Sequence, residues 1–276
     1  SDNHTVSPTG DQLLEDLHRL YKERIDHAGQ PEAGDVQPEL QALPDVKVVL
    51  FDVYGTLVQS AAGEISLHTD SERSTPFYRL AESLGSRIPF DRVEAIAEAF
   101  YEKIEEVHAA RSALGVTHPE VDIITVWHAL AERFPELQNG KQEGDFAQAR
   151  WLALRYELEA NPVAPMPGAL ETIRGLQKTG KHLGIVSNAQ FYTPLLFPLL
   201  FGKSHEALGF AHALWSYREG EAKPSAALFE KGADWFQKAY NLETNELLMV
   251  GNDMLNDIAP AQEIGMRTAL FGGDRR

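Results

Sequence analysis

The chain has 276 residues, of which 43% are hydrophobic and 24% charged, as in an ordinary globular protein. It has 25 Lys and Arg residues against 41 Asp and Glu residues, and the resulting formal net charge of −16 disfavours nucleic acids and anionic membranes as partners. It has no cysteine, which excludes disulfides, thiol nucleophiles and thiolate metal sites. No apolar stretch reaches membrane-helix length, and the polar first ten residues show no secretory signal. We expect a soluble cytoplasmic protein that acts on a small molecule, with its oligomeric state left open.

The N-terminal region is predicted to be a helical arm and linker over residues 1–44. Apolar residues recur at helical spacing in Gln12–Ala28, and Gly29 follows as a helix stop. The next segment, Gln30–Pro44, contains three prolines and is typical of a connector.

Three apolar runs of strand length alternate with helical segments further along the chain. The runs are Val46–Val53, His182–Asn188 and Glu246–Asp253. Continuous apolar strands are typical of a parallel sheet covered on both faces, and strands that alternate with helices indicate a doubly wound, Rossmann-like α/β core. We assign this discontinuous core to residues 45–68 and 164–276.

A long insertion, residues 69–163, separates the first strand from the rest of the core. It contains four segments with helical signals, beginning near residues 77, 91, 121 and 146. We expect it to form a separate helical subdomain.

Each predicted strand runs into polar residues at its carboxyl end, where α/β sheets bind ligands. The first is followed by Asp52, Tyr54, Gly55 and Thr56, and the second ends in Ser187 and Asn188. A buried strand-end Asp costs desolvation unless it has a partner, and a short hydroxyl can hold an anionic oxygen. Taken alone, these residues are also ordinary turn and helix-cap residues.

Two further segments could complete such a site. Lys223 precedes Pro224 and a predicted helix at Ser225–Gly232, although a lone lysine there is usually solvated. The third strand ends in GNDMLND, which places Asp253 and Asp257 four residues apart. Paired carboxylates suit a hard cation such as Mg²⁺, although Asp253 could equally cap the next helix.

Together and in this order, these segments resemble the four motifs of the haloacid dehalogenase superfamily. FDVYGTL is similar to motif I, VSN to motif II, KP to motif III and GNDMLND to motif IV, and the resemblance covers about Val46–Phe271. The helical insertion then takes the place of that superfamily's C1-type cap. The first 45 residues lie outside the resemblance.

The resemblance implies a role for each motif residue. Asp52 is expected to be the nucleophile of a covalent aspartyl intermediate, Ser187 to bind the transferring group and Lys223 to offset the charge of Asp52. Thr56 and Asn188 are expected to contact the substrate. The implied cofactor is Mg²⁺, and its expected ligands are Asp52, Tyr54 through its carbonyl, Asn252, Asp253 and Asp257.

Two positions depart from the superfamily's phosphatases. Where those enzymes carry a second Asp that works as acid and base, this chain has Tyr54, and a phenol with a pKa near ~10 is a poor base at neutral pH. This DxYGT form resembles the L-2-haloacid dehalogenase branch, which needs no metal and for which Arg79 is the candidate halide acceptor. In motif IV the usual first Asp after the glycine is Asn252.

Three hypotheses follow from these residues. The first is a Mg²⁺-dependent phosphohydrolase of a small, anionic metabolite, acting through Asp52. The second is a metal-independent 2-haloacid dehalogenase that uses the same Asp52. The third is a protein that keeps the fold but is catalytically weak and binds a ligand or partner.

Overall fold

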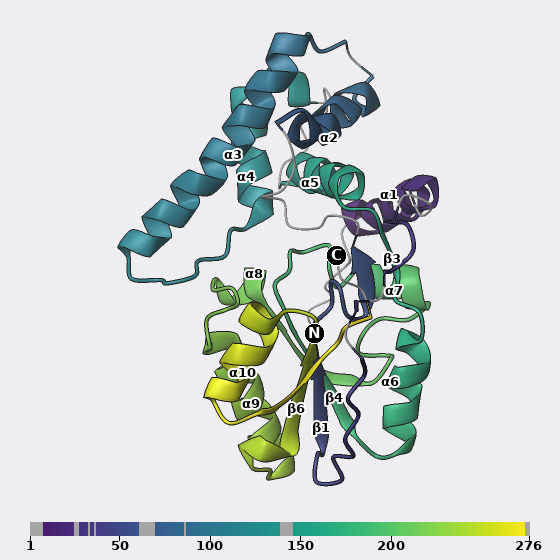
Figure 1. Ribbon diagram of the computed structural model, residues 1–276. Coiled ribbons are helices and arrows are strands. Elements are labelled where there is room, and N and C mark those ends of the chain that lie inside the picture. The colour runs from purple at the N-terminus through teal and green to yellow at the C-terminus, as the bar shows by residue number, and fades with distance from the viewer. Residues whose placement is uncertain are drawn as a thin grey trace, which may run out of the picture. The chain divides into compact units, whose positions relative to one another are not determined.

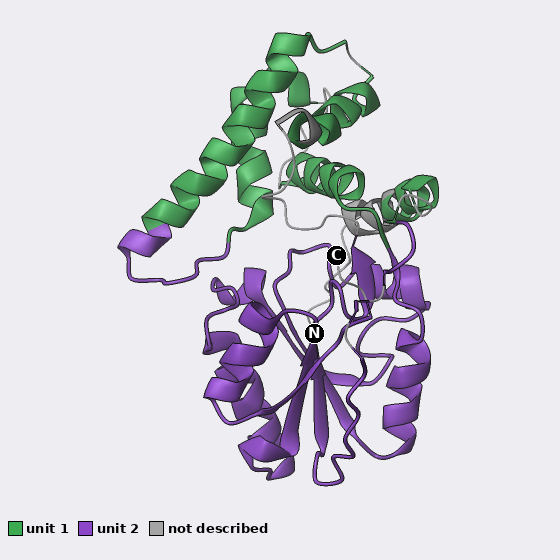
Figure 2. Ribbon diagram, viewed as in Figure 1, with its two compact units in different colours: residues 1–28, 61–110, 121–163 green, residues 29–60, 111–120, 164–276 purple. Residues whose placement is uncertain are grey.

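The computed structural model describes residues 8–24, 28–32, 34–35, 37–60, 70–85, 87–138 and 146–273. The chain divides into two compact units, coloured separately in Figure 2. One contains residues 1–28, 61–110 and 121–163, and the other contains residues 29–60, 111–120 and 164–276. The predicted border between residues 68 and 69 lies outside the described residues, as do the start of the predicted arm and the chain's last three residues.

The second unit is built on a five-stranded parallel sheet in the order β5-β4-β1-β6-β7. Figure 1 shows the sheet with helices on both sides, which confirms the predicted doubly wound, Rossmann-like α/β fold. A separate two-stranded sheet joins β2 to β3. The strands are β1 (Val48–Phe51), β2 (Val58–Ser60), β3 (Val163–Pro165), β4 (His182–Ser187), β5 (Phe210–Trp215), β6 (Leu247–Gly251) and β7 (Arg267–Leu270).

The helices of the second unit follow its strands in alternation. They are α6 (Ala169–Lys178), α7 (Leu196–Phe201), the one-turn α8 (Ser216–Glu219), α9 (Ala227–Tyr240) and α10 (Ala259–Glu263). A short 3₁₀ turn, η4 (Thr244–Glu246), precedes β6, and a π-helical turn, η5 (Met254–Ile258), follows it. Helix α9 is longer than the predicted Ser225–Gly232 because its apolar face continues to Phe236.

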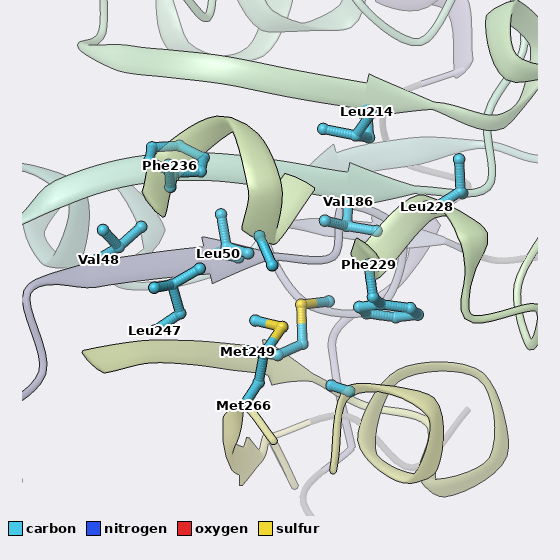
Figure 3. Close-up of a cluster of buried hydrophobic side chains, with 12 residues drawn as sticks. Val48, Leu50, Val186, Leu214, Leu228, Phe229, Phe236, Leu247, Met249 and Met266 are labelled. Carbon is cyan, nitrogen blue, oxygen red and sulfur yellow. The ribbon is translucent and has the colours of Figure 1, made fainter. Parts of the chain in front are cut away.

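The core of this unit forms where α9 and α10 cover one face of the sheet. Figure 3 shows alternate residues of the central strands, such as Val48 and Leu50 from β1, facing Phe229 and Phe236 from α9. All four side chains are fully buried. Successive residues of a strand point to opposite faces, so a strand buried on both sides must be apolar throughout. The run VVLF of β1, with all four residues buried, meets this requirement.

Parallel register brings the carboxyl ends of three strands to one edge of the sheet. Phe51 at the end of β1 pairs with Ile185 of β4 on one side and with Val250 of β6 on the other. The amide of Asp52 extends the β1–β6 ladder through a 3.0 Å hydrogen bond to the Val250 carbonyl. The residues that follow β1, β4 and β6 therefore share one edge of the sheet.

The first unit is helical, as predicted for the insertion. Its helices are α1 (Pro8–Arg24), α2 (Asp70–Ser83), α3 (Phe90–Ala113, whose last turn belongs to the second unit), α4 (Ile123–Arg133) and α5 (Ala147–Ala160), with a 3₁₀ turn, η3 (Pro135–Leu137). Four aromatic rings pack against one another in its core, with centroid distances of 4.8–6.1 Å: Phe77, Phe100, Trp127 and Tyr156.

A buried carboxylate ties α1 to this helical unit. Glu159 of α5 accepts ion pairs from Arg24 of α1 at 3.4 Å, Arg79 of α2 at 3.1 Å and Arg155 of α5 at 3.1 Å. The Glu159 side chain is only 5% exposed, and a buried charge is tolerated when it is paired. The N-terminal helix, which the sequence predicts as a helical arm, thus packs as a further member of the helical unit.

In the part of the chain that the structure describes, no helix is long and apolar enough to cross a membrane.

Candidate active site

Asp52 lies at the first position after β1, in a turn that its neighbours close tightly. The amides of Leu57 and Val58 both donate to the Val53 carbonyl, and the Gly55 amide donates to the Val58 carbonyl at 2.7 Å. Gly55 has a φ of +85°, and a Cβ there would lie 2.2 Å from the Asn252 side chain. Only glycine meets both conditions without strain. These contacts hold the turn closed directly after Asp52, at the carboxyl end of β1.

Lys223 joins the two carboxylates of the site. Its Nζ donates to Asp52 Oδ1 at 2.9 Å and to Asp257 Oδ1 at 2.5 Å, and it also reaches the Val186 carbonyl at 3.2 Å. The three charged side chains are 10%, 1% and 3% exposed for Asp52, Asp257 and Lys223 respectively. Two carboxylates and one ammonium group give the site a formal net charge of −1, and all three groups are almost completely buried.

Burial sets the protonation of this cluster. Desolvation raises the pKa of Asp52, the Lys223 ammonium lowers it and Asp257 raises it, so that it reaches about 6. For Lys223, desolvation lowers the pKa, but Asp52 and Asp257 together more than offset this and the net shift is upward. At neutral pH the cluster therefore holds an ionised Asp52 beside a protonated lysine.

The residues after β4 hold the backbone that carries this lysine. The Lys223 amide donates to Asn188 Oδ1 at 2.7 Å, and Asn188 Nδ2 donates to the Lys223 carbonyl at 3.2 Å. Ser187 is fully buried, and its hydroxyl donates to the Asn188 carbonyl at 3.0 Å. Thr56 donates to Asp52 Oδ2 at 3.4 Å. The structure thus brings together the predicted residues of motifs I, II and III.

Tyr54 points its hydroxyl toward the loop after β4. The Tyr54 hydroxyl and Thr193 Oγ1 are 2.9 Å apart. Thr193 is fully buried, and its Oγ1 also accepts from the Gln190 amide at 3.2 Å. The phenol that replaces the phosphatase acid is therefore hydrogen-bonded to another loop of the same unit.

Asp253 caps the turn that follows β6. Its Oδ1 accepts from the amides of Leu255 and Asn256 at 2.8 and 2.9 Å, and its Oδ2 accepts from Asn256 Nδ2 at 2.9 Å. Its own amide donates to Asp257 Oδ2 at 3.1 Å. This is the capping alternative that the sequence leaves open, and it commits both carboxylate oxygens of Asp253.

The oxygen donors beside Asp52 fit a hard cation such as Mg²⁺, but with fewer charges than the sequence suggests. Asp52 Oδ2 accepts a long bond from Thr56, and the side-chain amide of Asn252 lies against Gly55, the residue after Tyr54. A carboxylate, a carbonyl and an amide oxygen are donors that Mg²⁺ accepts together with water. The described residues contain no group of three or more His, Cys, Asp and Glu side chains suited to a metal.

Arg79, the candidate halide acceptor, belongs to the helical unit. Its guanidinium donates to Glu159 at 3.1 Å, and its side chain is 42% exposed. Its charge thus supports the packing of that unit.

Some residues that shape the site give no signal in the sequence. Thr193, Gln190, Ser216 and Glu120 all bond to the loop after β4 or to one another. None lies in a recognisable motif, and their partners are as many as 139 positions away. Only the folded chain reveals them.

The chain belongs to the haloacid dehalogenase-like hydrolases, because the sequence model of this family matches residues 46–265. This identifies the protein as an enzyme and confirms the family resemblance. Over 110 residues it is 31% identical to the glyceraldehyde 3-phosphate phosphatases of Pyrococcus abyssi and Pyrococcus furiosus. The matched stretch is 38% of this chain and spans 42% and 41% of those two proteins.

Solved structures with a similar fold include both kinds of enzyme. A 2-haloacid dehalogenase from Pseudomonas syringae pv. tomato is 23% identical, with a TM-score of 0.49, over 82% of this chain and 86% of that one. A HAD phosphatase from Thermococcus onnurineus is 21% identical, with a TM-score of 0.46, over 84% of this chain and 89% of that one.

The first prediction concerns Asp253. Replacing Asp253 with Ala should lower the free energy of unfolding by about 1 kcal/mol, because the cap of η5 is lost, whereas Asp253→Ser should keep most of the stability. Equilibrium urea denaturation measures both. If Asp253 acts only as a cap, Asp253→Ser also leaves the Mg²⁺ affinity measured by calorimetry within about twofold of the parent's. A loss of affinity of tenfold or more in Asp253→Ser would make Asp253 a metal ligand instead.

Proposed function

We propose that this chain is a phosphohydrolase of a small, anionic metabolite that acts through a covalent intermediate on Asp52. The observation that carries this proposal is the buried contact of Lys223 with both Asp52 and Asp257. A carboxylate becomes a good nucleophile when it is desolvated, ionised and aimed at a bound electrophile. Lys223 keeps Asp52 ionised in spite of its burial.

The reaction has two steps. In the first, an Asp52 oxygen attacks phosphorus, the P–O bond to the alcohol breaks, and the leaving alkoxide takes a proton from water. In the second, water attacks the phosphorus of the aspartyl phosphate, which releases inorganic phosphate and restores the carboxylate. Lys223 offsets the negative charge in both steps. The hydroxyls of Ser187 and Thr56, which donate to Asn188 and Asp52 in the structure, would turn toward the phosphoryl oxygens.

Mg²⁺ belongs to this proposal as the partner of the phosphate group. Asp52, the Tyr54 carbonyl and Asn252 would hold it, and Asp257 would contribute charge beside it. When bound, the cation neutralises charge on the phosphoryl oxygens. An anionic substrate needs this help, because the site itself carries a net charge of −1. The neutral Asn252 predicts an affinity below that of a site with two free carboxylates.

The similarity over 110 residues to the glyceraldehyde 3-phosphate phosphatases of Pyrococcus also supports phosphate chemistry. One observation favours a second function. Tyr54 stands where a phosphatase needs an acid, and its hydroxyl is bonded to Thr193. A halide leaves a carbon atom without taking a proton, so a metal-independent 2-haloacid dehalogenase could use Asp52 without that acid. A catalytically weak binding protein is the third alternative, and it would form neither product.

The second prediction tests the nucleophile and the metal together. Asp52→Asn should reduce phosphate release from a panel of sugar and triose phosphates by at least ~10³-fold, because the covalent step is lost. Chelation of Mg²⁺ should reduce the parent's rate similarly. The release of inorganic phosphate measures both effects.

The same samples distinguish the alternatives. Chloride release from 2-chloropropanoate that survives chelation and disappears in Asp52→Asn would establish the dehalogenase and overturn the proposal. Release of neither product by the parent chain would leave the binding protein.

The third prediction is the pH dependence. Because burial raises the pKa of Asp52 to about 6, the nucleophile is protonated and lost as the pH falls through that value. At Mg²⁺ concentrations well below saturation, where the metal does not itself hold Asp52 ionised, we expect kcat/KM to be level above about pH 7 and to fall about tenfold per pH unit well below 6. Steady-state kinetics with an alkyl and an aryl phosphate distinguishes the titration of Asp52 from that of the substrate. A pH dependence caused by the substrate differs between the two esters, because their phosphate groups have different pKa values. A pH dependence caused by Asp52 is the same for both. A rate that stays level down to pH 4.5 would contradict an Asp52 pKa near 6.

The fourth prediction restores the missing acid. Tyr54→Asp should raise kcat for phosphate esters about tenfold or more, because a positioned general acid contributes about 10²–10⁴-fold. Tyr54→Asn is the matched control, since asparagine has the same size as aspartate but cannot act as a proton donor. An equal effect of the two variants on kcat would contradict the idea that a missing acid limits the reaction.

A further inference from the structure

One segment of the helical insertion folds as part of the α/β unit. Residues 111–120 include the last turn of α3 and lead to α4, yet they cluster with the sheet and its helices, as Figure 2 shows by colour. We call residues 116–120 the strap. It pairs with the residues just ahead of Lys223: Pro119 forms an antiparallel bridge with Glu221, and the Ala222 amide donates to the His118 carbonyl at 2.7 Å. The strap thus fixes the backbone that leads into the catalytic lysine.

Further contacts strengthen this pairing. The Glu120 amide donates to the Gly220 carbonyl at 3.1 Å, and Arg111 Nη2 donates to the same carbonyl at 2.9 Å. Thr117 Oγ1 donates to Glu221 Oε1 at 3.3 Å. Residues 220–222 are therefore held from one side by both backbone and side chains.

The Glu120 carboxylate reaches the second loop of the site. Its Oε2 accepts from Ser216 Oγ at 2.6 Å, and its Oε1 accepts from Gln190 Nε2 at 3.2 Å. Ser216 is fully buried, and its Oγ also accepts from the Ala189 amide at 2.8 Å. Ala189 and Gln190 directly follow Ser187 and Asn188. Glu120 therefore stabilises the loop that follows Ser187, the serine proposed to bind phosphate.

The two loops meet at the site, where Asn188 binds both the amide and the carbonyl of Lys223. The strap contacts both of the loops that these Asn188–Lys223 hydrogen bonds join. Displacing a catalytic group by about 1 Å can cost about 10²-fold in rate. A residue that fixes both loops can therefore control turnover without touching the substrate.

We propose that Glu120 is a positioning residue that holds the Ser187 and Lys223 loops in register for catalysis. The inference rests on the proposed function, because it assigns these loops to phosphate transfer. It also gives the insertion a role inside the α/β unit, since the strap is the covalent link between α3 and α4.

The test compares Glu120→Ala with Glu120→Gln. Glutamine can still accept from Ser216, and Gln190 can turn its amide to present an oxygen, so Glu120→Gln should keep both hydrogen bonds without the charge. We expect Glu120→Ala to lower kcat for the best phosphate ester by at least about tenfold, with KM changed less than threefold. Glu120→Gln should restore kcat to within about threefold of the parent's. Glu105→Ala, at an exposed position of α3, is the matched control and should equal the parent.

Hydrogen exchange followed by mass spectrometry supplies a readout that needs no substrate. Amides of residues 187–193 and 219–225 should exchange faster in Glu120→Ala than in the parent and in Glu120→Gln. Unchanged exchange and unchanged kcat in Glu120→Ala would overturn the inference, as would equal losses in both variants. If the parent hydrolyses no phosphate ester, the proposed function fails, and faster exchange confined to Glu120→Ala still supports the positioning role.

Discussion

Two carboxylates and one ammonium group, all nearly out of reach of water, meet where the central strands of the sheet end. Burial alone would favour the protonated form of Asp52 there, because a buried charge without a partner costs several kcal/mol. Lys223 makes the arrangement possible by donating to both. Three strand ends contribute to this contact: Asp52 directly follows β1, Asp257 lies in the turn after β6, and Asn188 after β4 holds the backbone of the lysine.

The residues that depart from the superfamily's pattern have contacts of their own in the structure. Asp253 caps the first turn after β6, because its carboxylate accepts from the amides of Leu255 and Asn256. Asn252 lies against Gly55, where a Cβ would collide with its amide. Tyr54 makes its hydrogen bond to Thr193. The site thus keeps the proposed nucleophile, Asp52, and its counter-charge, Lys223. Tyr54 replaces the acid of the phosphatase pattern, and Asp253 caps a turn. This combination is compatible with slow phosphate transfer and is the reason why halide chemistry remains the second candidate.

Charged contacts also organise the insertion. In the helical unit a single carboxylate, Glu159, pairs with arginines from three helices and draws α1 into the unit. In the α/β unit, Glu120 of the strap joins the segments that follow β4 and β5. Each glutamate binds side chains from segments that are distant in sequence and so holds those segments together. Such contacts explain how one continuous insertion contributes to both units.

The sequence by itself determined the α/β class, the three central strands and the position of the motif residues. These features depend on local composition: a strand covered on both faces must be apolar, and parallel strands collect their end residues at one edge. The resemblance to the family's motifs then predicted Asp52, Ser187 and Lys223 as site residues. The edge strand β5 was not predicted, because His212 interrupts its apolar run. Tertiary structure alone decided that Asp253 caps a turn, that Arg79 binds Glu159 and that Tyr54 meets Thr193. A polar side chain takes its partner from the segments that folding brings within about 3 Å of it, and neither composition nor spacing encodes that choice.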